Sequence, residues 1–85
     1  MKYVLFIKNN CPFCVKAREF LDENSLPYKE VLFNDDQTNI LNDIKETCNW
    51  KTVPMIFYCT DGQAKFIGGY TDLIKQISSD DQKEW

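Results

Sequence analysis

The distribution of apolar positions along the chain predicts alternating strands and helices. Two uninterrupted apolar runs, Tyr3–Ile7 and Met55–Cys59, are typical of central strands covered on both faces. Apolar residues recur at helical spacing from Phe13 to Leu21 and again within roughly Gln37–Asn49, so two amphipathic helices are expected there. Tyr28–Phe33, which lies between them, is expected to form a further strand.

Turn-forming residues separate these elements and divide the rest of the chain. Asn24-Ser25-Leu26-Pro27 ends the first helix. Asp61-Gly62 is a strong hairpin signal, which predicts that Ala64–Ile67 pairs with the preceding strand as a short edge strand. The apolar positions within Leu73–Ile77 mark a short last helix, and we expect the polar tail that follows, residues 78–85, to fray.

The predicted order of elements is βαβαββα, and residues 1–85 show no sign of a second domain. A strand–helix–strand unit of this length implies a right-handed crossover between two parallel strands. The hairpin adds antiparallel pairing. We therefore expect an α/β fold in which a four-stranded mixed sheet is flanked by three helices, an arrangement that resembles the thioredoxin-like fold.

Composition and charge exclude several functional classes. The 85-residue chain has a formal net charge of −3, which gives it no general attraction to nucleic acid or to an anionic membrane. No stretch approaches the length of a membrane span, and the apolar run after Met1-Lys2 is too short for a secretory signal. We therefore expect a cytoplasmic location, and we also expect the protein to be a monomer.

Two cysteines, Cys11 and Cys14, stand between the first strand and the first helix. Residues three apart share one face of a helix and lie about 5–6 Å apart, a separation that a disulfide can bridge. Cys11 occupies the position of an N-cap, with Pro12 at the favoured first helical position. Helix N–H groups, the helix dipole and Lys8 upstream then favour thiolate over thiol at Cys11. Cys14 lies inside the first turn and is expected to be less exposed.

This asymmetry predicts a dithiol redox site in which Cys11 attacks and Cys14 resolves. A structural disulfide or half of a zinc site is the alternative for a CxxC pair. The chain has no histidine, which excludes Cys–His catalysis and every zinc pattern that contains histidine. Cys48 and Cys59 fall on apolar patterns and are expected to be buried, inert thiols, while Trp50 and the phenylalanines are expected to pack the core.

Three blocks, in this order and spacing, resemble the glutaredoxin family: Cys11-Pro12-Phe13-Cys14, Thr52-Val53-Pro54 and Gly68-Gly69-Tyr70-Thr71-Asp72. The resemblance covers nearly all of the chain. Phe13 stands where many members have tyrosine, and Lys51 stands where a basic residue commonly precedes the second block. The resemblance implies a glutathione-dependent thiol–disulfide oxidoreductase. Glutathione would be its co-substrate, no metal is expected, and its partners would be disulfide-containing proteins, with ribonucleotide reductase as one candidate.

Pro54 immediately precedes an apolar strand, where proline is permitted. The residues alone favour a trans bond, because most X–Pro bonds are trans. The resemblance instead implies a cis Val53–Pro54 bond, which would turn the Val53 backbone N–H and C=O outward to pair with an extended peptide such as glutathione. A plain loop proline is the alternative.

The third block is expected to bind the γ-glutamyl end of glutathione. Thr71 can cap the last helix, whose first N–H groups bind a carboxylate, and Asp72 can meet an ammonium group. A capped helix after a glycine turn is the alternative. The resemblance implies that the residues in contact with glutathione are Lys8, Phe13, Lys51, Thr52, Val53, Pro54, Gly69, Thr71 and Asp72.

Two other functions stay open at this stage. One is a binding module in which Cys11 and glutathione thiols from two chains hold a [2Fe–2S] cluster. Pro12 argues against it by resemblance, because cluster-binding relatives usually have a small flexible residue at that place. The other is a thioredoxin-type electron carrier that does not use glutathione, and the Gly68–Asp72 block argues against that function.

Overall fold

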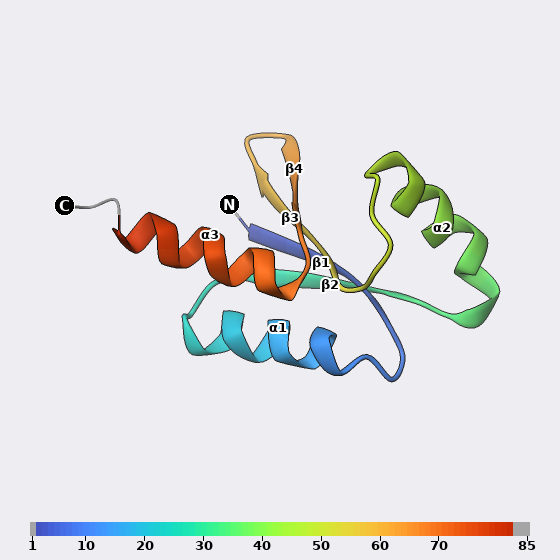
Figure 1. Cartoon of the computed structure of the whole chain (residues 1–85), viewed down its shortest axis with the longest axis horizontal. Helices are drawn as coiled ribbons and strands as arrows, with labels where there is room; N and C mark the ends of the chain where they lie inside the picture. Colours follow the sequence, from blue (N-terminus) through green and yellow to red (C-terminus); the bar gives the residue numbers. More distant parts are fainter. Residues whose placement is uncertain (1, 83–85) are drawn as a thin grey trace.

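The strands and helices follow one another in the predicted order (Figure 1). The computed structural model describes residues 2–82, with side chains for residues 2–77. The strands are β1 (Lys2–Lys8), β2 (Tyr28–Phe33), β3 (Met55–Thr60) and β4 (Gln63–Gly68). The helices are α1 (Pro12–Glu23), α2 (Thr38–Thr47) and α3 (Tyr70–Gln82), and a short 3-10 helix, η1 (Asp35–Gln37), precedes α2.

The four strands form one mixed sheet in the order β2-β1-β3-β4. β1 and β2 are parallel, with Tyr3 opposite Tyr28, as the strand–helix–strand unit predicted. β3 runs antiparallel to β1, with Met55 opposite Phe6, and β4 runs antiparallel to β3. Because β1 and β3 are adjacent and run in opposite directions, the last residues of β1 and the first residues of β3 lie at the same end of the sheet. The segments that follow β1 and precede β3 are therefore brought together.

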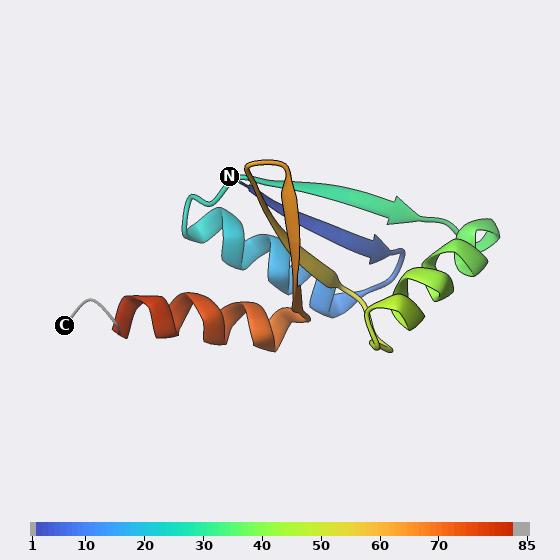
Figure 2. The same ribbon diagram turned by 90° about the horizontal axis from the view of Figure 1, so that it is seen from above.

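One face of the sheet is covered by α1 and α3, which lie side by side (Figures 1 and 2). Alternate residues of β1 point toward these helices, as expected for a strand whose side chains have a period of two. The buried residues of this layer are Tyr3, Leu5, Ala17, Leu21, Ile56 and Leu73. Each fully buried leucine of this kind contributes about 1.5–3 kcal/mol of burial free energy. This cluster fixes α1 and α3 against the sheet.

The opposite face carries aromatic rings and the apolar side of α2. Leu41 of α2 is buried with Phe33 and Met55. The Phe6 ring centroid lies 5.3 Å from that of Phe33 and 5.0 Å from that of Phe57, within the usual range for aromatic pairs. Helices therefore contribute to both faces of the sheet, as predicted.

Both α1 and α2 end in the same hydrogen-bonded motif, which reverses the chain without glycine. At the end of α1, Ser25 has a positive φ of 54°, and the Leu26 N–H donates to the Leu21 carbonyl at 2.9 Å. At the end of α2, Asn49 has a φ of 53°, a conformation that asparagine tolerates well. This turn places Trp50 at the beginning of the loop that leads to β3.

The last helix is longer than expected. α3 extends to Gln82, whereas the apolar pattern predicted a short helix around Leu73–Ile77. The five residues from Ser78 to Gln82 are all polar, so hydrophobic periodicity could not mark them as helical. Residues 83–85, which include Trp85, lie outside the described residues, and fraying of the tail stays a prediction. No helix within residues 2–82 is long and apolar enough to cross a membrane.

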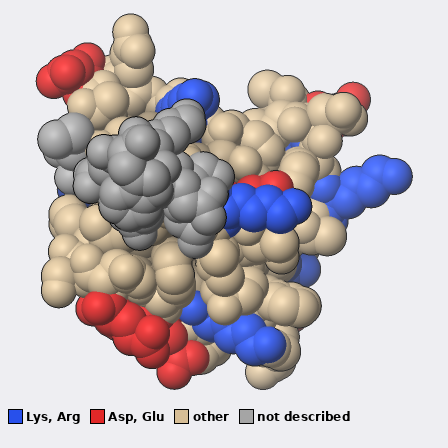
Figure 3. Space-filling view, turned by 60° about the vertical axis from the view of Figure 1, so that its left-hand side comes forward, with Lys and Arg blue, Asp and Glu red and all other residues tan. Residues whose placement is uncertain are grey.

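Charge is separated along α1. Arg18 lies in the middle of the helix, while Glu19, Asp22 and Glu23 are exposed in its last turns. On the face of the molecule shown in Figure 3, one acidic patch lies at the lower left, further acidic side chains lie elsewhere on the face, and basic side chains lie at the top, the centre, the right and the lower edge. The beginning of α1 therefore differs in charge from its end.

Candidate active site

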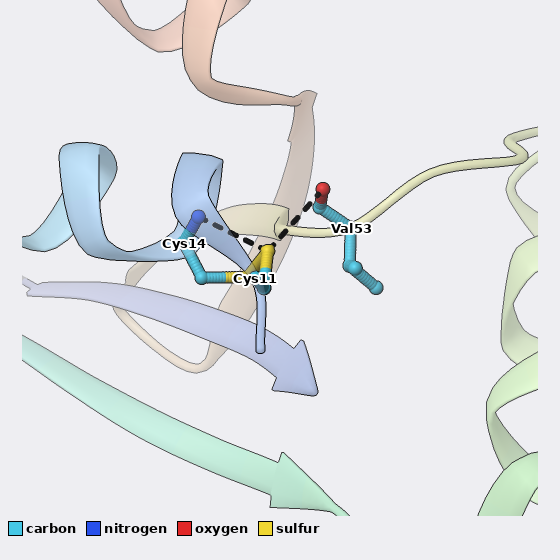
Figure 4. Close-up of a disulfide and its surroundings, with 3 residues drawn as sticks. All are labelled: Cys11, Cys14 and Val53. Carbon is cyan, nitrogen blue, oxygen red and sulfur yellow. Dashed lines mark hydrogen bonds between the residues drawn. A yellow bond between two sulfur atoms is a disulfide. The ribbon is translucent and has the colours of Figure 1, made fainter. Parts of the chain in front are cut away.

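Cys11 and Cys14 form a disulfide at the beginning of α1 (Figure 4). Their Cα atoms lie 5.2 Å apart, as the spacing predicted. Cys11 is the N-cap in an extended conformation (φ −116°), Pro12 is the first helical residue, and the Cys14 backbone N–H donates to Cys11 Sγ at 3.1 Å. Cys14 is 3% exposed, whereas Cys11 is half-buried. The more accessible sulfur is thus the one that a helix N–H contacts.

The loop before β3 brings a carbonyl group to this sulfur. The Val53–Pro54 peptide bond is cis, which confirms the bond that the family resemblance implied. The Val53 carbonyl oxygen lies 3.8 Å from Cys11 Sγ (Figure 4), although the two residues are 42 positions apart. A peptide that paired with the Val53 backbone would therefore run directly beside Cys11.

The third block forms the beginning of α3, with a different cap from the one expected. The helix starts at Tyr70, so Gly69 is at the N-cap position and Thr71 lies inside the first turn. The prediction that Thr71 caps the helix is wrong. Asp72 Oδ2 accepts the Gly69 N–H at 3.0 Å, so the cap comes from inside the helix. Gly68 has a φ of +130°, and a Cβ there would lie 2.5 Å from Asp72 Oδ2, so this turn requires glycine.

Most of the predicted contact residues surround one hollow of about 220 Å³, which we name the Asp72 hollow. It is lined by Phe13, Trp50, Thr52, Val53, Pro54, Gly69, Tyr70, Thr71 and Asp72. Three segments that are far apart in sequence thus meet around one space. Trp50 and Tyr70 were not among the predicted contact residues, although each is an aromatic side chain next to or within a block that was.

Phe13 is an aromatic residue at the surface and not in the core. It is 54% exposed, so the expectation that every phenylalanine packs the core is wrong here. Its ring centroid lies 6.2 Å from that of Tyr70, and Lys16 Nζ lies 5.1 Å from the Phe13 centroid. Phe13 therefore forms one wall of the Asp72 hollow and connects α1 to α3. The pattern of apolar positions cannot distinguish an exposed phenylalanine from a buried one. Only the position of Phe13 next to Cys14 indicated a place at the site.

A second open space, which we name the Arg18 groove, lies on the other side of the cysteines. Its volume is about 720 Å³. It is lined by Ile7, Lys8, Asn9, Asn10, Cys11, Pro12, Cys14, Val15, Arg18 and Leu32. Lys8 thus lines the same space as Cys11 and does not line the Asp72 hollow. Lys51 is exposed and lines neither space.

Cys48 and Cys59 are free thiols that are only half-buried. The expectation that both are buried is wrong. Cys48 is the C-cap of α2, and Cys59 lies near the hairpin end of β3. Each therefore lies close to the end of its element, where neighbouring side chains cover it only in part. Neither lines the Asp72 hollow or the Arg18 groove.

A four-stranded mixed sheet with a CxxC pair at the start of α1 and a cis proline opposite defines a dithiol protein of thioredoxin-like fold. The glutaredoxin family model matches residues 3–64 of this chain. The chain is 37% identical over 79 residues to glutaredoxin-1 of Sus scrofa, a match that covers 85% of this chain and 69% of that protein. It therefore belongs to the glutaredoxin family, which is consistent with thiol–disulfide oxidoreductase activity.

Other comparisons agree on the fold. The chain is 34% identical over 74 residues to the hybrid peroxiredoxin hyPrx5 of Haemophilus influenzae, and this match spans 87% of the chain but only 28% of that protein. Glutaredoxin 1 from Francisella tularensis, solved with cacodylate, superposes with a TM-score of 0.73 at 26% identity over 96% of this chain and 98% of that one. A buckwheat glutaredoxin–glutathione complex superposes with a TM-score of 0.76 at 21% identity, covering 92% and 69%.

Proposed function

We propose that this protein is a glutathione-dependent disulfide oxidoreductase in which Cys11 is the nucleophile and Cys14 the resolving cysteine. The observation that carries the proposal is the Asp72 hollow, which adjoins Cys11 and presents the three kinds of group that glutathione requires. These are a backbone carbonyl, a helix N-terminus and a carboxylate. Each contacts a different part of the tripeptide.

The γ-glutamyl end of glutathione carries a carboxylate and an ammonium group, and the beginning of α3 suits both. An α-helix leaves its first N–H groups without intrahelical acceptors, and here these include the N–H groups of Tyr70 and Thr71. The carboxylate of glutathione would bind there. Asp72, which is half-buried, would attract the ammonium group while its Oδ2 stays bonded to Gly69.

The cysteine part of glutathione would pair with the loop before β3. The Val53 carbonyl is available for one backbone hydrogen bond, in the manner of a one-residue strand. Since this carbonyl lies 3.8 Å from Cys11 Sγ, the paired cysteine would present its sulfur to Cys11. Lys8 and Lys51 would attract the glycine carboxylate.

The chemistry is thiol–disulfide exchange. The Cys11 thiolate attacks the glutathione sulfur of a mixed disulfide, a Cys11–glutathione disulfide forms, and the other thiol leaves as its thiolate. A second glutathione thiolate then attacks the bound glutathionyl sulfur. Glutathione disulfide leaves and the Cys11 thiolate is restored, so two electrons have passed from glutathione to the substrate.

Protein disulfides would require both cysteines. Attack by Cys11 joins it to one substrate sulfur and releases the other as a thiolate. The Cys14 thiolate then attacks Cys11 Sγ, which releases the second substrate thiolate and leaves the Cys11–Cys14 disulfide seen in this structure. Two glutathione molecules would reduce that disulfide in the next half of the cycle.

The test is turnover of a cysteine–glutathione mixed disulfide, with glutathione regenerated by glutathione reductase and NADPH. Saturable NADPH oxidation that depends on this protein and on glutathione is expected. No turnover with glutathione, together with efficient reduction by a flavoprotein thioredoxin reductase, would favour the electron carrier. An as-purified protein with the visible absorbance of a [2Fe–2S] cluster would favour the binding module.

A further inference from the structure

We propose that the Arg18 groove is a docking site for a protein substrate, and that it binds the extended segment around the substrate disulfide when that segment carries acidic and apolar side chains. The inference rests on the proposed function, because it names a substrate class for the same cysteines. It concerns a surface that, apart from Lys8 and the cysteines, lies outside the proposed glutathione site.

The position of the groove is the first reason. Cys11 and Cys14 both line it, so a polypeptide joined to Cys11 can leave the site through it. The Asp72 hollow is lined by residues of α3, whereas the Arg18 groove is lined by Leu32 of β2. The two spaces share no lining residue, and the groove is the larger, at about 720 Å³ against about 220 Å³. A polypeptide in the groove would therefore leave the Asp72 hollow open for glutathione.

The charge of the groove determines which segment fits. Lys8 and Arg18 line it, and none of its lining residues is acidic. Arg18 Nη1 lies 3.4 Å from Glu30 Oε1, a contact that uses one of the five N–H donors of the guanidinium. The Arg18 side chain is 40% exposed, so its other donors can reach a ligand carboxylate. An acidic side chain next to the substrate cysteine complements both cations.

The apolar surface of the groove supplies the second kind of contact. Val15 is 43% exposed and Leu32 is 46% exposed, and both line the groove together with Ile7. The groove therefore presents apolar surface that a side chain of a partner can cover. A single apolar side chain of the substrate would cover Val15 and Leu32 together.

The edge of the sheet explains why the segment should be extended. β2 pairs only with β1 in the described sheet, so the backbone groups along its outer side face away from the sheet. Leu32 belongs to β2, which therefore forms part of the groove wall. An extended segment can bond to such an edge while its alternate side chains enter the groove.

The experiment compares two peptides, each closed by one intramolecular disulfide. They share an apolar residue beside the cysteine and differ only in the flanking charges, two aspartates in one and two lysines in the other. Pre-reduced protein, freed of reductant and without glutathione, is mixed with each peptide in equal amount. Cys11 and Cys14 become a disulfide and the peptide becomes a dithiol, so electrons balance without another reductant. The rate is measured from the peptide thiols formed.

The acidic peptide should react at least several-fold faster than the basic one at low ionic strength, and added salt should reduce the difference. Arg18→Gln should slow the acidic peptide by about twofold to fivefold. Leu32→Ser should slow both peptides by about threefold to tenfold, because each carries the apolar residue. Arg18→Lys keeps the charge and should retain most of the preference.

Lys65→Gln and Ile40→Ser are the matched controls. Lys65 is an exposed cation on β4, and Ile40 is a 55% exposed apolar residue on α2, and neither lines the groove. Neither change should alter the ratio of the two peptide rates. Thermal unfolding of every variant would identify any that is poorly folded, in which case Leu32→Thr replaces Leu32→Ser.

Equal rates for the two peptides, or an equal effect of the control variants, would overturn the inference. So would an equal slowing of glutathione mixed-disulfide turnover by Arg18→Gln. Failure of the proposed function has a different result: the wild-type protein would prefer the acidic peptide but show no turnover with glutathione. Retained glutathione turnover without a preference for the acidic peptide would disprove the docking site and leave the proposed function standing.

Discussion

Asp72 Oδ2 accepts a hydrogen bond from the Gly69 backbone N–H at 3.0 Å, which links a charged side chain to the N-cap of its own helix. One carboxylate therefore has two tasks: it completes the beginning of α3, and it is the acidic group of the Asp72 hollow. A substitution that keeps the hydrogen bond to Gly69 but removes the charge can separate the contribution of Asp72 to stability from its contribution to ligand binding.

Asp72→Asn retains an oxygen that can accept the Gly69 N–H but removes the charge. It should leave thermal stability nearly unchanged and weaken glutathione-dependent turnover several-fold through affinity, since a partly exposed charge pair contributes about 0.2–1 kcal/mol. Asp72→Ala should have the same kinetic effect and should also destabilise the protein, by about 0.5–2 kcal/mol for a lost cap. Steady-state kinetics and chemical denaturation measure the two effects. Unchanged glutathione kinetics in Asp72→Asn would show that the ammonium group of glutathione does not bind at Asp72.

Gly68→Ala should displace Asp72, because the added Cβ would lie 2.5 Å from Oδ2 and the φ of +130° is unfavourable for alanine. We expect a loss of stability of about 1–3 kcal/mol together with weaker glutathione turnover. Gly62→Ala is the matched control, since Gly62 also has a positive φ of 77° but has nothing within 4 Å of a Cβ. Its stability should fall while its glutathione kinetics stay close to wild type. Similar kinetic losses in both variants would show that the loss follows from lower stability and not from displacement of Asp72.

Cys11→Ser should abolish all turnover, because Cys11 is the accessible sulfur at the beginning of α1. Cys14→Ser should keep activity on glutathione mixed disulfides and lose the reduction of intramolecular protein disulfides, because Cys14 is 3% exposed and acts only on Cys11. Both activities are measured with each variant at equal glutathione. The roles are reversed if Cys14→Ser loses both reactions and Cys11→Ser keeps them.

The reduced protein should be alkylated fastest at Cys11. We expect the Cys14 N–H, the dipole of α1 and Lys8, which lines the same groove as Cys11, to stabilise a thiolate there, so the iodoacetamide rate should reach half its maximum below about pH 8.5. Peptide mass mapping assigns the modified residue, and Cys48 and Cys59 in the same molecule are the internal controls. A Cys11 profile like that of the two control thiols would contradict the role of the helix.

The fold was largely predictable because local signals agreed with one another. The run Tyr28–Phe33 forms β2 with the predicted limits, since Pro27 and Asn34 bound it on either side. The Asp61-Gly62 turn has positive φ at both residues, as its hairpin signal indicates. The cis bond before Pro54 was different: only the family resemblance implied it, because residue type alone favours trans.

The site was predicted less completely, because contacts across the sheet leave no periodic signal. Trp50 packs against the core, as predicted, but it also lines the Asp72 hollow, because a left-handed Asn49 turns the chain at the end of α2. Thr71 has the residue type of a cap but lies two residues too late, since Gly69 and Asp72 cap the helix together. The Phe13 ring lies close to Tyr70 of α3, which is far away in the sequence, so no local pattern predicts this pairing.

The Cys11–Cys14 disulfide closes a ring over a sequence separation of only three residues, all of it within the first turn of α1. The loop-closure entropy that a cross-link removes from an unfolded chain grows with the number of residues enclosed, so this bond restricts the unfolded ensemble less than a cross-link between distant residues would. Opening and closing the bond is therefore expected to change the folding equilibrium less than reduction of a long-range disulfide would.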